Sequence, residues 1–217
     1  MSRYCGDKDA TEVLKAAEVW KNRALINGKS VFTENELWTL ENLRYLDEYF
    51  VQSLDWGEGS FLEKLETQLE SCPNPAKALC AEMMWVMLLA PRNVTPSTKK
   101  QNINTIMGWS DDVISPSHEL LSDEVLSGVG SAGPGYNNFR WMELVYFIRL
   151  LSKYYSELQS VREALLTDGD RFTEWCESIE DNDSRQLRHM LLFLLFPDTH
   201  ERIFGGSHRA KIVSAFT

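Results

Sequence analysis

The segment that most constrains the fold is residues 185–196, a nearly continuous apolar run that ends at Pro197. Leucine and methionine recur at helical spacing on one face, and leucine and phenylalanine cover most of the other: Leu187, Met190, Leu191, Leu194 and Leu195, then Leu192, Phe193 and Phe196. A helix that is apolar all round is buried on several sides. It is also too short to span a membrane, which takes roughly 20 apolar residues. The sequence therefore predicts a buried central helix over 187–196, around which other elements pack.

Helical spacing of apolar residues also recurs through the rest of the chain, and no convincing run alternates with the period of two that is typical of strands. Thr33–Glu36 and Ser60–Glu63 match the capping box that begins a helix. Asn74–Pro75 and Thr95–Pro96 each place a capping residue before a proline. We expect an all-α domain of about nine to ten helices over residues 1–217. An alternative divides it into subdomains 1–110 and 111–217.

The composition excludes several classes of protein. The chain has 217 residues and a formal net charge of −10, which argues against broad, non-specific binding to a phosphate backbone. The four cysteines (Cys5, Cys72, Cys80 and Cys176) form no CxxC pair and match neither a zinc site nor a disulfide scaffold. Residues 1–7 lack the apolar core of a signal peptide, so we expect a cytoplasmic protein with no membrane segment. The apolar, uncapped end at 211–217 suggests a fragment of a longer protein.

The C-terminal part reverses the acidic balance of the chain. Residues 185–217 hold five lysine and arginine side chains against two carboxylates. The candidate ligand-binding residues form a basic patch around the central helix: Arg185, Arg188, His189, Arg202, His208, Arg209 and Lys211. The simpler interpretation is a basic surface that faces an acidic one, within the protein or on a partner. His189, His200 and His208 are close enough in sequence to converge, but no metal-binding spacing is present, so hydrogen-bonding roles are favoured over a metal site.

Residues 128–138 form the one glycine-rich stretch. Gly128, Gly130 and Gly133 match G-x-G-x-x-G literally, but no strand precedes them and no phosphate-binding lysine follows, so a nucleotide site is not expected. We expect a mobile or tightly turned connection that ends at an Asn137/Asn138 cap of the next helix. The alternative is a loop that grips a partner through these glycines together with Tyr136 and Asn137.

Two further features allow a functional and a structural interpretation. Glu82 lies in an almost entirely apolar helix, so we expect its carboxylate to reach the surface or to meet an arginine, with a catalytic role as the less favoured alternative. Trp56 and Trp109 are in predicted loops, where a ring can stack on a base, clamp a peptide or simply cover the edge of the core. No nucleophile, base or metal set converges in the sequence, so no catalytic residue, metal or cofactor is expected.

Several segments resemble one known family in the same order along the chain. They are residues 39–50, 60–69, 81–91, 128–137 and 185–198, continuing through 201–203 and 207–213. Together these segments resemble the helical N-terminal region of bacterial McrB-like AAA+ NTPases, the motor subunits of modification-dependent restriction and related phage-defence systems. The similarity spans roughly residues 35–216, and the Arg185–Asp198 segment is its most specific part.

The resemblance implies a non-catalytic recognition or regulatory module. In that family the nucleotide site lies in a later AAA+ domain, so this chain alone would not hydrolyse nucleotide. The implied ligand is DNA or another phage-derived signal, and the implied partners are the protein's own downstream AAA+ domain, a nuclease subunit and further copies of the full-length protein. The alternative is an adaptor that assembles proteins through an exposed apolar patch.

Overall fold

The computed structural model describes residues 9–115 and 117–216 and confirms the all-α fold. This part of the chain contains no strand and eleven α-helices. The first six are α1 (Thr11–Trp20), α2 (Leu40–Leu46), α3 (Phe61–Leu69), α4 (Asn74–Leu89), α5 (Pro96–Met107) and α6 (Gly133–Asn138). The others are α7 (Arg140–Ser156), α8 (Gln159–Leu165), α9 (Gly169–Cys176), α10 (Leu187–Leu195) and α11 (Gly206–Phe216). Two helices continue as π-helix, α1 through Lys21–Ile26 and α2 through Asp47–Val51.

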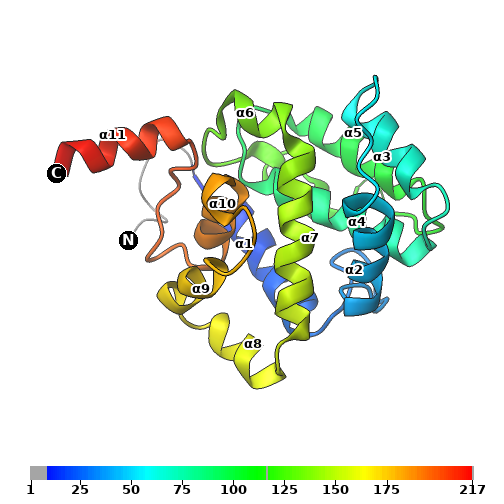
Figure 1. The fold of residues 1–217 in the computed structure, drawn as a ribbon, viewed down its shortest axis with the longest axis horizontal. Helices are drawn as coiled ribbons and strands as arrows, with labels where there is room; N and C mark the ends of the chain where they lie inside the picture. Colours follow the sequence, from blue (N-terminus) through cyan, green and yellow to red (C-terminus); the bar gives the residue numbers. More distant parts are fainter. Residues whose placement is uncertain (1–8, 116, 217) are drawn as a thin grey trace.

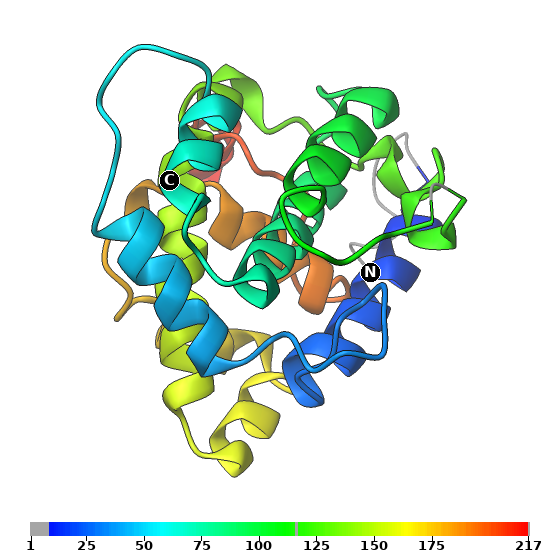
Figure 2. The same cartoon turned by 90° about the vertical axis from the view of Figure 1, so that its right-hand side faces the viewer.

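Helix α4 is the most enclosed element of the fold. All but three of its 16 residues are buried, and α1, α2, α5 and α7 pack against it. Figures 1 and 2 show α4 passing through the middle of the molecule, with the long α7 alongside. The buried helix predicted over 187–196 is present as α10, and apart from Arg188 and His189 its residues are buried. The interior is therefore built on two apolar helices from opposite halves of the sequence.

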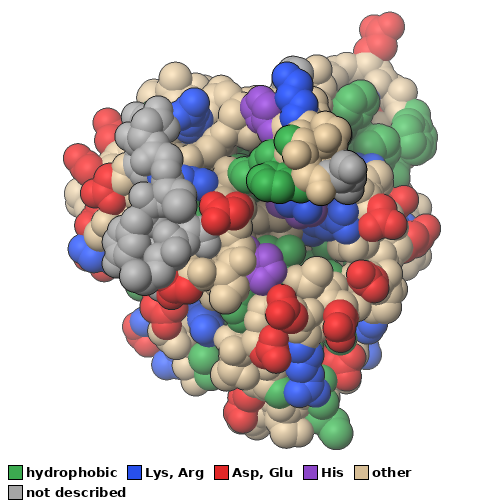
Figure 3. Space-filling view, turned by 90° about the vertical axis from the view of Figure 1, so that its left-hand side faces the viewer, with side chains coloured by type: hydrophobic (Ala, Val, Ile, Leu, Met, Phe, Trp, Pro, Cys, Tyr) green, Lys and Arg blue, Asp and Glu red, His purple; other side chains and the backbone are tan. Residues whose placement is uncertain are grey.

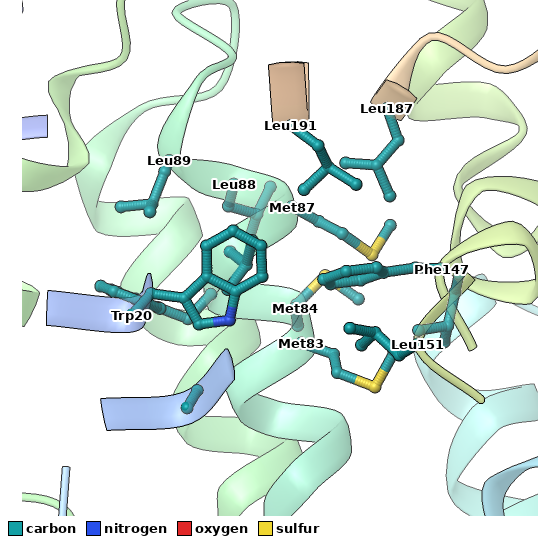
Figure 4. Packing of buried hydrophobic residues seen from close by; sticks show 14 of the residues in the cluster. Trp20, Met83, Met84, Met87, Leu88, Leu89, Phe147, Leu151, Leu187 and Leu191 are labelled. Atoms are coloured by element: carbon teal, nitrogen blue, oxygen red, sulfur yellow. The ribbon is translucent and has the colours of Figure 1, made fainter. Parts of the chain in front are cut away.

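One continuous hydrophobic core joins both halves of the chain. In Figure 4 the methionines of α4 lie beside Phe147 and Leu151 of α7, with Leu187 and Leu191 of α10 above them. Hydrogen bonds also connect the two halves of the chain. For example, the hydroxyl of Tyr155 donates to the carbonyl oxygen of Ala24 at 2.9 Å. Truncating one such buried leucine or methionine to alanine removes about 2–5 kcal/mol of stability.

The buried carboxylate of Glu82 organises the connection between α1 and α2. It accepts hydrogen bonds from the Ser30 hydroxyl, from the Val31 amide at 3.0 Å and from the Trp38 indole Nε1 at 2.5 Å. The prediction that Glu82 reaches the surface or meets an arginine is therefore wrong. A buried carboxylate needs donors, and three neutral groups of this connection supply them.

The same contacts explain why the capping box predicted at Thr33–Glu36 is absent. These residues remain in the connection, and α2 begins only after Thr39, whose hydroxyl accepts a hydrogen bond from the Asn42 amide at 3.2 Å. Binding to Glu82 holds residues 30–38 in a non-helical path that local sequence alone does not indicate.

Other local patterns act as the sequence predicts. Ser60 and Glu63 form the predicted capping box of α3, and Thr95 caps α5, with Pro96 at its first position. At Asn74–Pro75 the helix starts one residue earlier than expected, because Pro73 occupies the capping position.

The glycine-rich stretch is neither an open loop nor a cap. Gly128 has a φ of +74°, and the amides of Val129 and Gly130 both donate to the Ala90 carbonyl oxygen, at 2.9 and 3.1 Å. A Cβ on Gly128 would lie 2.7 Å from the Arg92 nitrogen and closer still to the Pro91 carbonyl, so only glycine fits. The chain then forms α6, and α7 begins after Phe139 without a side-chain cap, so the predicted Asn137/Asn138 cap is wrong.

Helix α11 differs from all the others because none of its residues is buried. Figure 1 shows it leaving the helical body beyond α10, with Phe216 near its end. The side chains of Val213 and Phe216 are 62% and 89% exposed. Within residues 9–115 and 117–216, no helix has both the length and the apolar character needed to cross a membrane.

Candidate functional site

Three of the predicted basic-patch residues meet at one cavity. Arg188 and His189 from the first turn of α10, and Arg209 from α11, line a cavity of about 310 Å³ together with His200. We refer to it as the arginine cavity. Basic and histidine side chains gather around a hollow beside the protruding tip of α11 (Figure 3). The loop after Pro197 turns back over α10 and brings α11 close to the first turn of α10. The cavity lies where these two helices meet.

Arg188 is held firmly in this cavity. Its side chain is 22% exposed, its Nη1 donates to an Asp183 carboxylate oxygen at 3.0 Å, and its Nε donates to His189 Nε2 at 3.2 Å. The guanidinium group is therefore oriented before any ligand arrives, which lowers the entropy lost on binding.

His189 is neutral at physiological pH. Burial, together with the positive charges of Arg209 and Arg188, lowers its pKa to about 3. Because Nε2 accepts the hydrogen bond from Arg188, the neutral ring carries its proton on Nδ1. His200 is likewise shifted to a lower pKa, chiefly by burial. Its ring nitrogens lie 3.0 Å from the Thr199 hydroxyl and 3.3 Å from the Thr173 hydroxyl.

The two arginines affect each other electrostatically. Partial desolvation lowers the pKa of the Arg209 guanidinium, and the charge of Arg188 lowers it further, so the two positive charges repel each other. Two exposed carboxylates, Glu177 and Glu201, also line the cavity. The lining therefore combines two guanidinium groups with two carboxylates. An anion between the guanidinium groups would relieve their repulsion.

The other four predicted basic residues do not line this cavity. Arg185 donates to the Ser184 hydroxyl at 2.8 Å, and Arg202 lies near Asp9, whose pKa it helps to lower. His208 and Lys211 are on the exposed surface of α11. The sequence placed seven residues in one patch because it could not show where the loop after Pro197 turns. Seven lining residues lie outside the predicted patch, and of these the sequence indicated only His200 as a possible neighbour of His189: Thr173, Cys176, Glu177, Asn182, Leu192, His200 and Glu201.

The predicted binding loop is largely occupied by structural contacts. Gly128, Gly130 and Tyr136 are buried, and the Tyr136 hydroxyl donates to the Met87 carbonyl oxygen at 2.8 Å. Gly133 and Asn137 are partly exposed, and the Asn137 carboxamide accepts a hydrogen bond from Arg140 at 3.4 Å. These contacts fix α6 on α4 and leave little of the stretch for a ligand.

The cysteines lie in settings that suppress thiolate chemistry. Burial raises the pKa of Cys72 to about 11 and that of Cys176 to about 12, and Cys80 is shifted in the same direction. Cys5 lies outside the described residues. In the part of the chain that the structure describes, no three His, Cys, Asp or Glu side chains are grouped to hold a metal ion.

Comparison of the chain with family models, with curated proteins and with solved structures finds no match. The resemblance to McrB-like proteins therefore stays a prediction from the sequence segments. The geometry of the arginine cavity stands independently of that similarity.

Proposed function

We propose that this chain is a non-catalytic recognition and regulatory module of a McrB-like AAA+ protein in a restriction or anti-phage system. Its ligand is DNA or another anionic phage-derived signal, bound through a phosphate group in the arginine cavity. The observation that carries the proposal is the meeting of Arg188 and Arg209, from two separate helices, at one cavity. Nucleotide hydrolysis belongs to an AAA+ domain that follows this region in the full-length protein.

The chemistry of the cavity suits a phosphate. Arginine presents a planar fork that matches two phosphate oxygens, and charge-assisted hydrogen bonds of this kind are about twice as strong as neutral ones. Because His189 is neutral, the positive charge that attracts the phosphate comes from Arg188 and Arg209. A net charge of −10 limits attraction to duplex DNA over the whole surface, so binding depends on this local geometry.

The test is the binding of labelled duplexes, methylated and unmodified, at about 50 and about 200 mM salt. Arg209→Ala is the cleanest perturbation, because Arg209 is exposed and its removal leaves the Arg188–Asp183 ion pair in place. We expect about tenfold weaker binding and a salt slope smaller by about one. The matched control is Lys15→Ala, which removes one positive charge from the exposed face of α1.

The outcome separates the hypotheses. Preference for the methylated duplex identifies the module as the target reader. Equal weakening by Arg209→Ala and Lys15→Ala would refute the cavity as the phosphate site, and the absence of binding to either duplex would refute DNA as the ligand.

The second candidate function is an adaptor that docks on the AAA+ ring or on a nuclease subunit. One observation favours it, namely that α11 carries exposed Ile212, Val213 and Phe216 on a helix without a buried residue. Sedimentation velocity of the chain mixed with the AAA+ portion of its own protein tests this function. A complex that is lost in Val213→Asp but retained in Leu158→Asp, which alters another exposed apolar side chain, would support the adaptor.

A further inference from the structure

An exposed tryptophan marks a second site, at the opposite end of the molecule from α11. Trp56 is 77% exposed, whereas Trp109 packs against the core as a simple covering residue. Trp56 belongs to the connection 52–60, drawn in cyan, which stands away from the helical body in Figure 2. Single exposed apolar side chains are common on protein surfaces, but Trp56 lies against a second tryptophan at the edge of a cavity.

The Trp56 ring forms a right-angled corner with Trp141, from the first turn of α7. The ring centroids are 5.3 Å apart and the planes meet at 83°. The corner borders a cavity of about 260 Å³, also lined by Phe50, Phe61 and Asp55. This volume is below that of the usual pockets for small organic ligands and is suited to a single side chain.

The connection that carries Trp56 is held in a defined path. Asp55 accepts a hydrogen bond from the Gly57 amide at 2.7 Å, and Lys64 donates to the Gly57 carbonyl oxygen. Gln68 donates to the Ser53 carbonyl oxygen at 2.5 Å. The aromatic corner is therefore positioned before a ligand binds, which favours affinity.

The chain segment that carries Trp56 is strongly acidic. Residues 47–70 contain seven aspartate and glutamate side chains and one basic residue, Lys64, which also lines the cavity and whose ammonium group donates to the Gly57 carbonyl oxygen. An acidic setting repels the phosphates of a nucleic acid and attracts a cation. The face of an indole also attracts a cation through its quadrupole, and tryptophan does so best among the aromatic residues.

We propose that the Trp56–Trp141 corner binds an arginine side chain presented by a basic segment of a partner protein. The guanidinium group would stack on an indole face, with the carboxylate of Asp55 in the cavity lining. This site is independent of the arginine cavity and of the function proposed for it, because it takes the opposite charge.

The experiment measures fluorescence anisotropy of a labelled peptide with six arginines, titrated with the complete chain at low ionic strength. The matched probe replaces every arginine by citrulline, which keeps the shape and removes the charge. We expect wild type to bind the arginine peptide, the citrulline peptide to bind at least tenfold more weakly, and Trp56→Ala to weaken arginine binding about tenfold. Trp56→Phe should recover part of the affinity. Because Trp56 is exposed, its removal leaves the core intact, and circular dichroism confirms folding.

The acidic residues stay in place in Trp56→Ala, so general attraction to the surface is unchanged in that variant. Equal affinity of wild type and Trp56→Ala for the arginine peptide would therefore overturn the proposal, as would equal binding of the citrulline peptide. A single-stranded oligonucleotide that binds through Trp56 while the arginine peptide does not would replace it with base stacking.

Discussion

Replacing Glu82 by glutamine tests the organisation of the core through its pH dependence. Burial raises the pKa of Glu82 to about 7, although hydrogen bonds from Ser30, Val31 and Trp38 act to lower it. In the unfolded chain the same carboxyl has its ordinary value of 4.5. The folded state therefore keeps a proton that the unfolded state has lost, so this stabilisation is complete below pH 4.5 and disappears as the pH rises through 7.

The magnitude follows from the two pKa values. Their separation corresponds to roughly 3 kcal/mol, of which about 2 kcal/mol is lost between pH 5.5 and 8.5. Glutamine cannot titrate, but it presents one oxygen where the carboxyl presents two, which costs about 1–2 kcal/mol at any pH. We expect Glu82→Gln to be about as stable as wild type at pH 5.5, where wild type has already lost about 1.4 kcal/mol, and more stable by about 1–2 kcal/mol at pH 8.5.

The assay is urea unfolding followed by tryptophan fluorescence at intervals across this range, where the chain keeps its net negative charge. Glu66→Gln is the matched control, because it removes a carboxylate from the exposed surface of α3. A constant difference between wild type and Glu82→Gln at every pH would refute the reasoning, since it would mean that Glu82 does not titrate between these values.

Three further changes probe other parts of the fold. Burial lowers the pKa of Lys99 from 10.5 to about 7. The buried lysine therefore destabilises the folded chain most below pH 7 and less as the pH rises towards 10.5. We expect Lys99→Met to be more stable than wild type below pH 7, and this difference in unfolding free energy, measured by urea unfolding, should shrink by about 1.4 kcal/mol per pH unit up to 10.5. Gly128→Ala should lower the unfolding free energy by more than about 3 kcal/mol because backbone atoms occupy the space, whereas Gly133→Ala, with a φ of +75° and open space, should cost only about 1 kcal/mol in the same titration. Ser60→Ala should lower the free energy of unfolding by about 1 kcal/mol, because α3 loses its N-cap. An unchanged calorimetric transition would contradict a capping role for Ser60.

The sequence predicted what depends on neighbours along the chain. Helical periodicity located α10, and the Ser60–Glu63 box gave the correct start of α3. The same box pattern failed at Thr33–Glu36, because a carboxylate about fifty residues away withdraws Ser30 and Trp38 from helical geometry. Local capping preferences are worth about 1 kcal/mol, whereas an unsatisfied buried carboxylate costs several.

The candidate site was predicted only in part for a similar reason. Arg188 and His189 are adjacent, so one helix brings them together, but the contribution of Arg209 depends on the path of the loop after Pro197. That path is set by tertiary packing, such as Phe204 against Phe193 at 6.1 Å between ring centroids. Arg202 and Lys211 are just as basic and lie elsewhere, because charge alone carries no positional information.

The enclosure of α4 has a consequence during protein synthesis. Its apolar surface is complete once Leu89 has been translated, but α7 and α10, which cover it, follow by as much as a hundred residues. At about 5–20 residues per second, the nascent chain carries an uncovered apolar helix for roughly 5–20 s. Helix α4 is therefore the segment that a ribosome-associated chaperone would bind, and chains released before α10 would aggregate through it.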